Sequence, residues 1–239
     1  MSTIYSIIVP VYKNEETIEP LLERLDDLAV RLDSALEVVF VVDGSPDRSY
    51  ELLQKHLPDC NFPSQLVRLS RNFGSFAAVR MGLTCAQGEY IATMAADLQE
   101  PADLVLEFFA ALEREPVDLV LGTRQQRLDP LTTRTTARAF WSIYCLLVQP
   151  DMPVGGVDVF GCNRRVRDAV LQLNETHSSL VSQLIWLGFR RKEIGYIRKE
   201  RSAGRSAWTF RKKWRYMTDS VYSFTNLPIF LISLSVSAR

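Results

Sequence analysis

The sequence predicts an α/β fold with a mostly parallel central sheet flanked by helices on both faces. Short runs of β-branched and aromatic residues alternate along the chain with longer segments whose apolar residues recur at helical spacing. This alternation is typical of strands joined by crossover helices, and strands without a polar face are typical of parallel sheets covered on both sides. With 239 residues, 47% of them hydrophobic, the chain can bury a substantial core.

Five strands and four helices account for the first half of the chain. The clearest helical period lies in the segment 14–33, where apolar residues recur every three or four positions. The expected strands cover residues 4–12, 36–45, 64–70, 88–94 and 117–123, and the expected helices cover residues 14–33, 46–56, 76–88 and 101–115.

The alternation weakens after residue 124. No repeat, linker or low-complexity segment interrupts this half, so we expect it to complete one domain over residues 1–207, followed by a separate stretch over 208–239. We expect a loop over 127–136, a helix over 137–148, a strand with turns over 154–163, a helix over 178–189 and a strand over 192–197.

Composition narrows the class of protein. The four cysteines lie far apart without a CxxC pair, and only two histidines are present, which argues against a zinc site and a disulfide framework. The first residues lack a basic segment, and their apolar run is too short to cross a bilayer. We therefore expect no secretory signal and a cytosolic location for the bulk of the protein.

Charge is unevenly distributed although the formal net charge is zero. Residues 15–59 contain twelve acidic and four basic side chains, whereas residues 190–215 contain eleven basic and two acidic side chains. Anions are therefore expected to bind the C-terminal part of the chain.

Polar side chains follow the predicted strands, at the point where each strand passes into a loop. Ligands of parallel α/β sheets bind beyond the carboxyl ends of the strands, so a site is expected at these junctions. Asp43 and Asp97 end different strands, although either carboxylate could instead cap a helix or form an Asx-turn. The junction residues are Tyr12, Asn14, 43–47, 71–74, 97–99 and Arg124.

Five segments stand out in order along the chain: "SIIVPVYKNEETI", "VVDGSPDRS", "RLSRNFGSFAAVRMGL", "MAADLQEP" and "FGCNRRV". Together they resemble the family-two glycosyltransferases with the A-type fold, and among these the polyprenyl-phosphate sugar synthases of the dolichol-phosphate mannose synthase type. The resemblance covers roughly residues 4–225. It implies a Rossmann-like nucleotide-diphospho-sugar transferase fold and transfer of a hexose from a nucleotide-sugar.

The resemblance also implies a donor site at the strand ends. Pro10 and Tyr12 resemble the floor of the base and ribose site, and Asp43 is similar to the family's base-recognising aspartate. Lys13 and Asn14 replace the Asn and Glu of many members, which leaves both UDP-hexose and GDP-hexose open as donors. The implied donor-binding residues are Pro10, Tyr12, Asn14, Asp43, Ser45, Arg71 and Ala95.

Asp97 resembles the later aspartate of the family's D-x-D element, which holds Mg²⁺ or Mn²⁺ against the donor diphosphate, and Gln99 resembles an accessory ligand. Ala95 departs from the usual "DADLQ" and removes one carboxylate. Mg²⁺ is commonly held by one or two carboxylates plus substrate phosphates, so a site remains feasible. Three interpretations stay open: a natural single-carboxylate site, a substitution made to trap a complex, and an inactive relative.

Arginines are expected to bind the acceptor phosphate, because the guanidinium fork matches phosphate oxygens. Arg124, Arg134 and Arg201 resemble the family's acceptor ligands, with Arg127 or Arg138 as substitutes for Arg134. The acceptor implied is a membrane polyprenyl phosphate, which is already ionised and needs no strong general base. Asp158 resembles a position near the acceptor or donor sugar, so the implied catalytic residues are Asp97, Arg124 and Asp158.

The segment 208–239 joins a basic and aromatic stretch to a short apolar run. This mixture suits an interfacial helix on anionic lipid, and an ordinary helix that closes the domain is the alternative. We expect the protein at the cytoplasmic face of the membrane, either peripheral or anchored, with a homo-oligomer left open and no nucleic-acid partner.

Two other functions remain open. The same fold could transfer the sugar to a saccharide hydroxyl, with Asp158 as the base. A binding protein that keeps nucleotide affinity but has lost turnover through Ala95 is the rival from another class.

Overall fold

In the computed structural model, the described part of the chain comprises residues 4–33, 35–126, 149–153, 156–173, 175 and 179–198, with single residues at 218, 219, 221, 222, 225 and 233. The loop expected over 127–136, the helix expected over 137–148 and most of the stretch 208–239 lie outside these residues. Within the described ranges, no helix is both long and apolar enough to cross a membrane.

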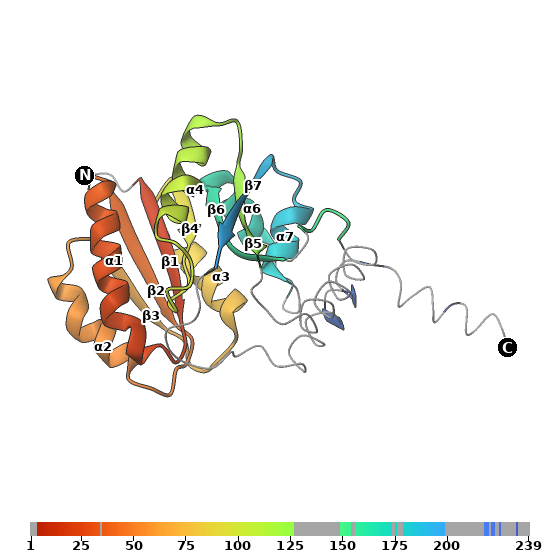
Figure 1. Ribbon diagram of the computed structural model, residues 1–239. Helices are drawn as coiled ribbons and strands as arrows, with labels where there is room; N and C mark the ends of the chain where they lie inside the picture. The colour runs from red at the N-terminus through yellow and green to blue at the C-terminus, as the bar shows by residue number, and fades with distance from the viewer. Residues whose placement is uncertain are drawn as a thin grey trace.

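Seven strands form one sheet in the described part of the chain, in the order β3-β2-β1-β4-β6-β5-β7 (Figure 1). The strands predicted from the apolar runs are all present. Their bounds are β1 Tyr5–Val11, β2 Leu36–Val42, β3 Ser64–Arg68, β4 Tyr90–Thr93, β5 Leu119–Gln126, β6 Val157–Asn163 and β7 Arg191–Ile197.

One strand reverses the direction of the sheet. β1 pairs in parallel with β2 and β4, β2 with β3, and β5 with β7. β6 lies antiparallel between β4 and β5. The sheet is therefore mostly parallel, as expected, and the first residues of β6 lie at the edge where the other strands end.

Helices cover both faces of the sheet, as the sequence predicts (Figure 1). On one face, α1, α2 and α4 pack against inward side chains of β1 and β2 such as Ile7 and Phe40. On the other face, α3, α6 and α7 pack against Ile8 and Val39. The helices are α1 Ile18–Arg31, α2 Ser49–His56, α3 Ser75–Cys85, α4 Asp103–Arg114, α6 Arg164–Gln172 and α7 Leu180–Trp186, with 3₁₀ turns at Glu15–Thr17 and Leu57–Asp59.

Helix α3 lies unusually close to β1. A Cβ atom added at Gly82 would lie 2.3 Å from Cγ2 of Ile8, so only glycine allows this approach. Close packing of α3 fixes the position of its N-terminal end, which lies beside the carboxyl end of β2.

Candidate functional site

Asp43 and Asp97 lie at the same edge of the sheet. Asp43 follows β2 directly, Asp97 follows β4 by a short turn, and β1 lies between these two strands. Neighbouring strands are about 4.8 Å apart, so two strand spacings place the two junctions roughly 10 Å from each other. The strand ends that the sequence marks as a candidate crevice therefore do come together.

Proline is tolerated at position 10 of β1 because the sheet does not need a backbone N–H there. Ile8 accepts a hydrogen bond from the backbone N–H of Met94, which places the β4 side of β1 at Ile8. Residues two apart in a strand face the same neighbour, so Pro10 faces the same side beyond the last β1–β4 pair, Ile8 with Thr93. The N–H that proline lacks is therefore not needed for the sheet.

Asp43 is buried, and backbone donors already hold its carboxylate. It is 2% exposed, and it accepts hydrogen bonds from the backbone N–H of Phe73 at 2.7 Å and of Gly74 at 2.8 Å. These donors immediately precede α3. Asp43 thus anchors the 71–74 loop to β2, which is a structural use of the residue that the resemblance implies for base recognition.

Gly44 and Arg71 complete this contact. Gly44 has φ +56°, and a Cβ atom there would lie 2.3 Å from the carbonyl carbon of Arg71, so the two backbones touch. The Arg71 guanidinium lies 4.1 Å from the centre of the Phe73 ring, and Phe73 is 48% exposed. An exposed aromatic ring stacked with arginine therefore lies beside the strand ends.

Asp47 organises the loop after β1. Its carboxylate accepts from the hydroxyls of Ser45 and Ser49 and from the backbone N–H of Glu15. Ser45 accepts in turn from the N–H of Lys13, which has φ +57°. Burial alone would raise the pKa of Asp47, but these hydrogen bonds outweigh it and the pKa is lowered. Asp47 is the last residue of the 43–47 junction that the sequence places after a strand.

Tyr12 and Asn14 belong to the same loop. The side-chain oxygen of Asn14 accepts from the backbone N–H of Tyr12 at 3.1 Å, and the backbone N–H of Asn14 donates to the Ser49 hydroxyl at 3.1 Å. The ammonium group of Lys13 lies 5.6 Å from the centre of the Tyr12 ring. Tyr12, Asn14 and Ser45 are thus brought together as the sequence predicts, with Lys13 between them.

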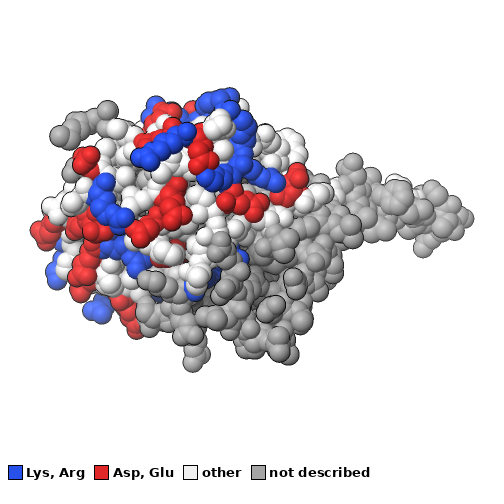
Figure 2. All heavy atoms as spheres, turned by 45° about the horizontal axis from the view of Figure 1, so that its top comes forward, with Lys and Arg blue, Asp and Glu red and all other residues white. Residues whose placement is uncertain are grey.

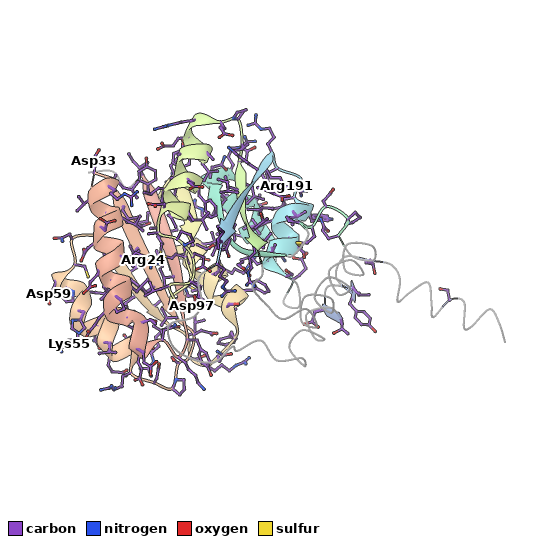
Figure 3. All side chains as sticks on the ribbon, viewed as in Figure 1. Arg24, Asp33, Lys55, Asp59, Asp97 and Arg191 are labelled. Carbon is purple, nitrogen blue, oxygen red and sulfur yellow. The ribbon has the colours of Figure 1, made fainter. Side chains whose placement is uncertain are left out.

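Asp97 and Gln99 contact the guanidinium of Arg198, which follows the edge strand β7. Arg198 follows β7, and its Nη2 atom lies 3.5 Å from Oδ2 of Asp97 and donates to Oε1 of Gln99. The turn that presents these oxygens contains Leu98 at φ +59°. Figure 3 shows Asp97 toward the middle of the view, whereas Asp33, Lys55 and Asp59 lie at the outer side beside α1 and α2.

Asp158 connects two arginines. Because β6 is antiparallel, Asp158 at its start lies beside the ends of β5 and β7, where Arg124 and Tyr196 pair in register. Its Oδ2 atom forms an ion pair with Arg124, accepts from the Tyr196 hydroxyl at 2.9 Å and lies 3.9 Å from Arg198. Burial would lower the pKa of Arg124, but Asp158 outweighs it and raises the pKa.

Glu100 adds a buried carboxyl group next to Asp97. It is 4% exposed, and burial, followed by the nearby charge of Asp97, raises its pKa to about 7. Among the described residues its Oε2 atom has no hydrogen-bond partner, and the same is true of Nε of Arg198. We call Asp97, Gln99, Glu100, Arg124, Asp158, Tyr196 and Arg198 the strand-end cluster.

Asp97, Gln99 and Glu100 are the residues of the strand-end cluster that could hold a divalent cation. The oxygens of Asp97 and Gln99 already converge on one cationic atom, and the Glu100 carboxyl, whose Oε2 atom has no partner among the described residues, lies next to Asp97. Within the described ranges, no group of three or more His, Cys, Asp or Glu side chains could hold a metal alone. Substrate phosphates would therefore have to complete the coordination, as is usual for Mg²⁺.

The sequence-predicted residues divide into three sets. Pro10, Tyr12, Asn14, Asp43, Ser45 and Arg71 lie along the ends of β1, β2 and β3, and Asp97, Gln99, Arg124 and Asp158 belong to the strand-end cluster, with Ala95 at the end of β4. Arg134 and Arg201, with the substitutes Arg127 and Arg138, lie outside the described residues. Glu100, Tyr196 and Arg198 were missed, although the acidic "DLQEP" could have indicated Glu100.

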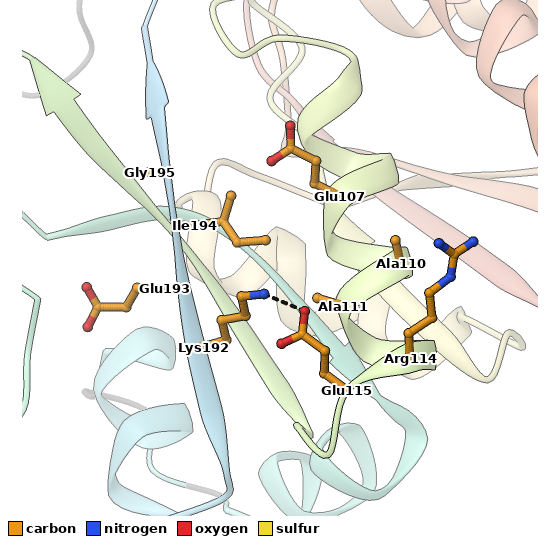
Figure 4. Close-up of a pocket in the computed structure, with 9 residues that line it drawn as sticks. All are labelled: Glu107, Ala110, Ala111, Arg114, Glu115, Lys192, Glu193, Ile194 and Gly195. Atoms are coloured by element: carbon orange, nitrogen blue, oxygen red, sulfur yellow. Dashed lines mark hydrogen bonds and ion pairs between the residues drawn. The ribbon is translucent and has the colours of Figure 1, made fainter.

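A separate hollow of about 520 Å³ lies between α4 and the edge strand β7 (Figure 4). An ion pair between Glu115 and Lys192 lies across it. Its residues come from the C-terminal end of α4 and the first half of β7, away from the strand-end cluster. Figure 2, which brings the top of Figure 1 forward, shows acidic and basic side chains interspersed on that face. Nothing in this hollow resembles a reaction centre.

Comparison with known proteins identifies the family and agrees with the fold. The family model described as "Glycosyl transferase family 2" matches residues 6–192. The uncharacterized glycosyltransferase YkcC of Bacillus subtilis is 32% identical over 96% of this chain and 71% of its own. The undecaprenyl-phosphate 4-deoxy-4-formamido-L-arabinose transferase of Salmonella choleraesuis is 30% identical over 96% of this chain and 70% of its own.

Solved structures share the architecture at lower identity. The mannosyltransferase PcManGT of Pyrobaculum calidifontis, in complex with GDP-Man and Mn²⁺, has a TM-score of 0.61 at 20% identity and covers 86% of this chain. This chain spans 59% of that protein. Glucosyl-3-phosphoglycerate synthase of Mycobacterium tuberculosis, with Mn²⁺ and UDP, has a TM-score of 0.58 at 17% identity over 92% of this chain and 77% of its own. The chain belongs to glycosyl transferase family 2, has the fold of the nucleotide-sugar transferases, and is a glycosyltransferase.

Proposed function

We propose that the protein transfers a hexose from UDP- or GDP-hexose to a membrane polyprenyl phosphate, with inversion and with the help of Mg²⁺ or Mn²⁺. The observation that carries the proposal is the strand-end cluster, where Asp97, Gln99 and Asp158 face Arg124 and Arg198. The named relative from Salmonella choleraesuis, which uses undecaprenyl phosphate, supports the choice of acceptor. The Mn²⁺ complexes of the structural neighbours support the choice of metal.

The donor would lie along the ends of β1, β2 and β4. Tyr12 and the exposed Phe73 offer aromatic surfaces near the base, and Asp43 acts by holding the 71–74 loop in place. The diphosphate would meet Asp97 and Gln99 through the cation, which supplies charge for the leaving phosphates. The arginines of the cluster add fixed positive charge where negative charge develops.

The acceptor phosphate would bind near Arg124. Asp158 forms an ion pair with Arg124, and the Tyr196 hydroxyl donates a hydrogen bond to the same carboxylate oxygen. Arg134 and Arg201 are proposed to join Arg124 around the phosphate. An ionised phosphate attacks without first losing a proton, so the site needs orientation and charge rather than a strong base.

A saccharide hydroxyl as acceptor is less well supported. That reaction requires a base, and Asp158 was the candidate. Its Oδ2 atom forms an ion pair with Arg124, accepts a hydrogen bond from Tyr196 and faces Arg198, so it positions these side chains rather than accepting a proton from a hydroxyl. A binding protein without turnover was the rival from another class because Ala95 lacks a carboxylate, and the match to glycosyltransferase relatives speaks against it.

The location proposed is the cytoplasmic face of the membrane, where the basic and aromatic segment 208–217 would lie on anionic lipid. A homo-oligomer is not part of the proposal.

Product analysis tests the proposal directly. The full chain is incubated with radiolabelled UDP-hexose or GDP-hexose, Mn²⁺, and either undecaprenyl phosphate in detergent or free saccharides. Label in the lipid fraction is the expected result. Label in saccharide products would favour the hydroxyl acceptor, and nucleotide binding without turnover of any donor would favour the binding protein.

A further inference from the structure

Arg198 lies where a cation held by Oδ2 of Asp97 and Oε1 of Gln99 would lie. Its Nη2 atom donates to Oε1 of Gln99 and is 3.5 Å from Oδ2 of Asp97. A divalent ion held by both oxygens would stand within about 2.0–2.6 Å of each of them. The ion and Nη2 would then occupy nearly the same space, and both carry positive charge. They cannot occupy it together.

The guanidinium is held there by charge but is incompletely satisfied. Its Nη1 atom lies 3.9 Å from Asp158, so two carboxylates attract it, whereas its Nε atom is buried without a hydrogen-bond partner in the part of the chain that the structure describes. A buried donor without a partner weakens the bound arrangement. Oε2 of Glu100, beside Asp97, is likewise buried and has no partner within the described ranges. Both unsatisfied groups indicate an arrangement that exchanges for another one.

We infer that Arg198 is a built-in competitor for the divalent cation: it occupies the position between Asp97 and Gln99 until a nucleotide diphosphate arrives. The inference rests on the proposed function, because it takes Asp97 and Gln99 as cation ligands. The diphosphate brings negative charge, which draws in the metal ion and gives the displaced guanidinium a new partner. Arg198 therefore couples metal binding to donor binding.

This coupling offers a physical reason why the site can function with Ala95. A site with fewer carboxylates binds free metal weakly, and Arg198 weakens that binding further. The donor diphosphate supplies the missing negative charge. Metal and donor would then bind together, and neither would bind well alone.

The test measures Mn²⁺ binding to the full chain by electron paramagnetic resonance, with and without UDP or GDP. Removing the competing charge in Arg198→Gln should tighten nucleotide-free Mn²⁺ binding by about tenfold or more. Arg198→Lys keeps the charge and should bind Mn²⁺ as weakly as the wild type. Arg191→Gln is the matched control. Arg191 lies at the opposite end of β7 from Arg198 and donates a hydrogen bond to the backbone carbonyl of Asp151. Thermal melts confirm that each variant is folded.

The outcomes separate the inference from the function it rests on. In the double variant Arg198→Gln with Asp97→Asn, the gain in Mn²⁺ affinity should disappear. If Arg198→Gln binds Mn²⁺ no better than wild type while nucleotide still recruits the ion through Asp97, the inference is wrong and the proposed function stands. If no variant binds Mn²⁺ with or without nucleotide, both the inference and the metal dependence fail.

Discussion

Two groups of carboxylates lie at the same edge of the sheet but are held in different ways. Asp43 and Asp47, after β2, are fixed mainly by backbone N–H groups and by short serine side chains. Asp97 and Asp158, in the strand-end cluster, face the long side chains of Arg124 and Arg198. The backbone N–H groups that contact Asp43 cannot move away unless the loop unfolds. Arginine side chains can move away from Asp97 and Asp158 while the backbone stays in place.

This difference separates architecture from chemistry. The first pair builds the loops on which a nucleotide could rest, and the second pair presents charge that a ligand can rearrange. Both pairs lie at strand ends, so position alone does not identify a reaction centre. The groups that contact each carboxylate, backbone and serine in one pair and arginine in the other, distinguish the two. Four substitutions test this distinction.

The largest effect is expected at Asp97. Asp97→Asn removes the charge that would face the cation, so transfer should fall by at least about 1,000-fold, or about 4 kcal/mol, with little change in thermal stability. Asp103→Asn is the matched control, because Asp103 pairs with Arg31 on the surface of the protein. Turnover of labelled donor measures the effect, and near-normal turnover would remove Asp97 from the reaction.

A comparable loss, but of stability, is expected at Asp43. Asp43→Ala leaves the N–H groups of Phe73 and Gly74 buried without their acceptor, which should cost about 3 kcal/mol of unfolding free energy. Urea denaturation measures it, with the exposed Asp59→Ala as control. Wild-type stability combined with lost nucleotide binding would instead make Asp43 a ligand of the base.

A smaller effect is expected for Arg124. Arg124→Ala should lower kcat/KM for the lipid phosphate by roughly 30-fold, or about 2 kcal/mol, because a charge-assisted contact is lost. Nucleotide affinity measured by calorimetry should stay within about twofold of wild type. Arg190→Ala, which removes an arginine paired with Asp118 at the amino end of β5, is the control. Equal loss of donor and acceptor binding would assign Arg124 to the donor.

The smallest effect is expected at Asp47 and depends on pH. Asp47→Asn should destabilise the protein by about 1 kcal/mol at pH 7, because one oxygen that accepts hydrogen bonds becomes a donor. The folded-state pKa of Asp47 is lowered, so its contribution is complete above the unfolded pKa of about 4 and is lost as pH falls through the folded value. The difference in unfolding free energy between wild type and Asp47→Asn should therefore narrow as pH falls from 7 to 3, and a difference that stays constant would contradict this.

The sequence predicts much of the fold because apolar runs and helical spacing report burial directly. It does not predict the direction of β6, because an apolar run looks the same in a parallel and an antiparallel strand. It also gave no indication of α6, whose arginines outnumber its buried residues, Val166 and Val170. The reversal of β6 matters for the site, since it places Asp158 beside Arg124.

The candidate site is less predictable because its members come from distant parts of the chain. Asp97 and Gln99 follow β4 and Arg124 lies near the end of β5, so position and resemblance both indicated them, whereas Asp158 was indicated by resemblance alone. Arg198 lies 101 positions after Asp97, and only the pairing of β5 with β7 brings it near. Glu100 escaped notice because its burial depends on packing that no local pattern shows.

One measurement tests the central claim, that Asp97 and Gln99 receive a cation together with the donor diphosphate. Crystals grown with Mn²⁺ and UDP or GDP would be examined for anomalous scattering from manganese. We predict a peak within coordination distance of Asp97 and Gln99, with the Arg198 side chain moved toward the phosphates. A manganese peak elsewhere, or nucleotide bound with Arg198 still between Asp97 and Gln99, would contradict it.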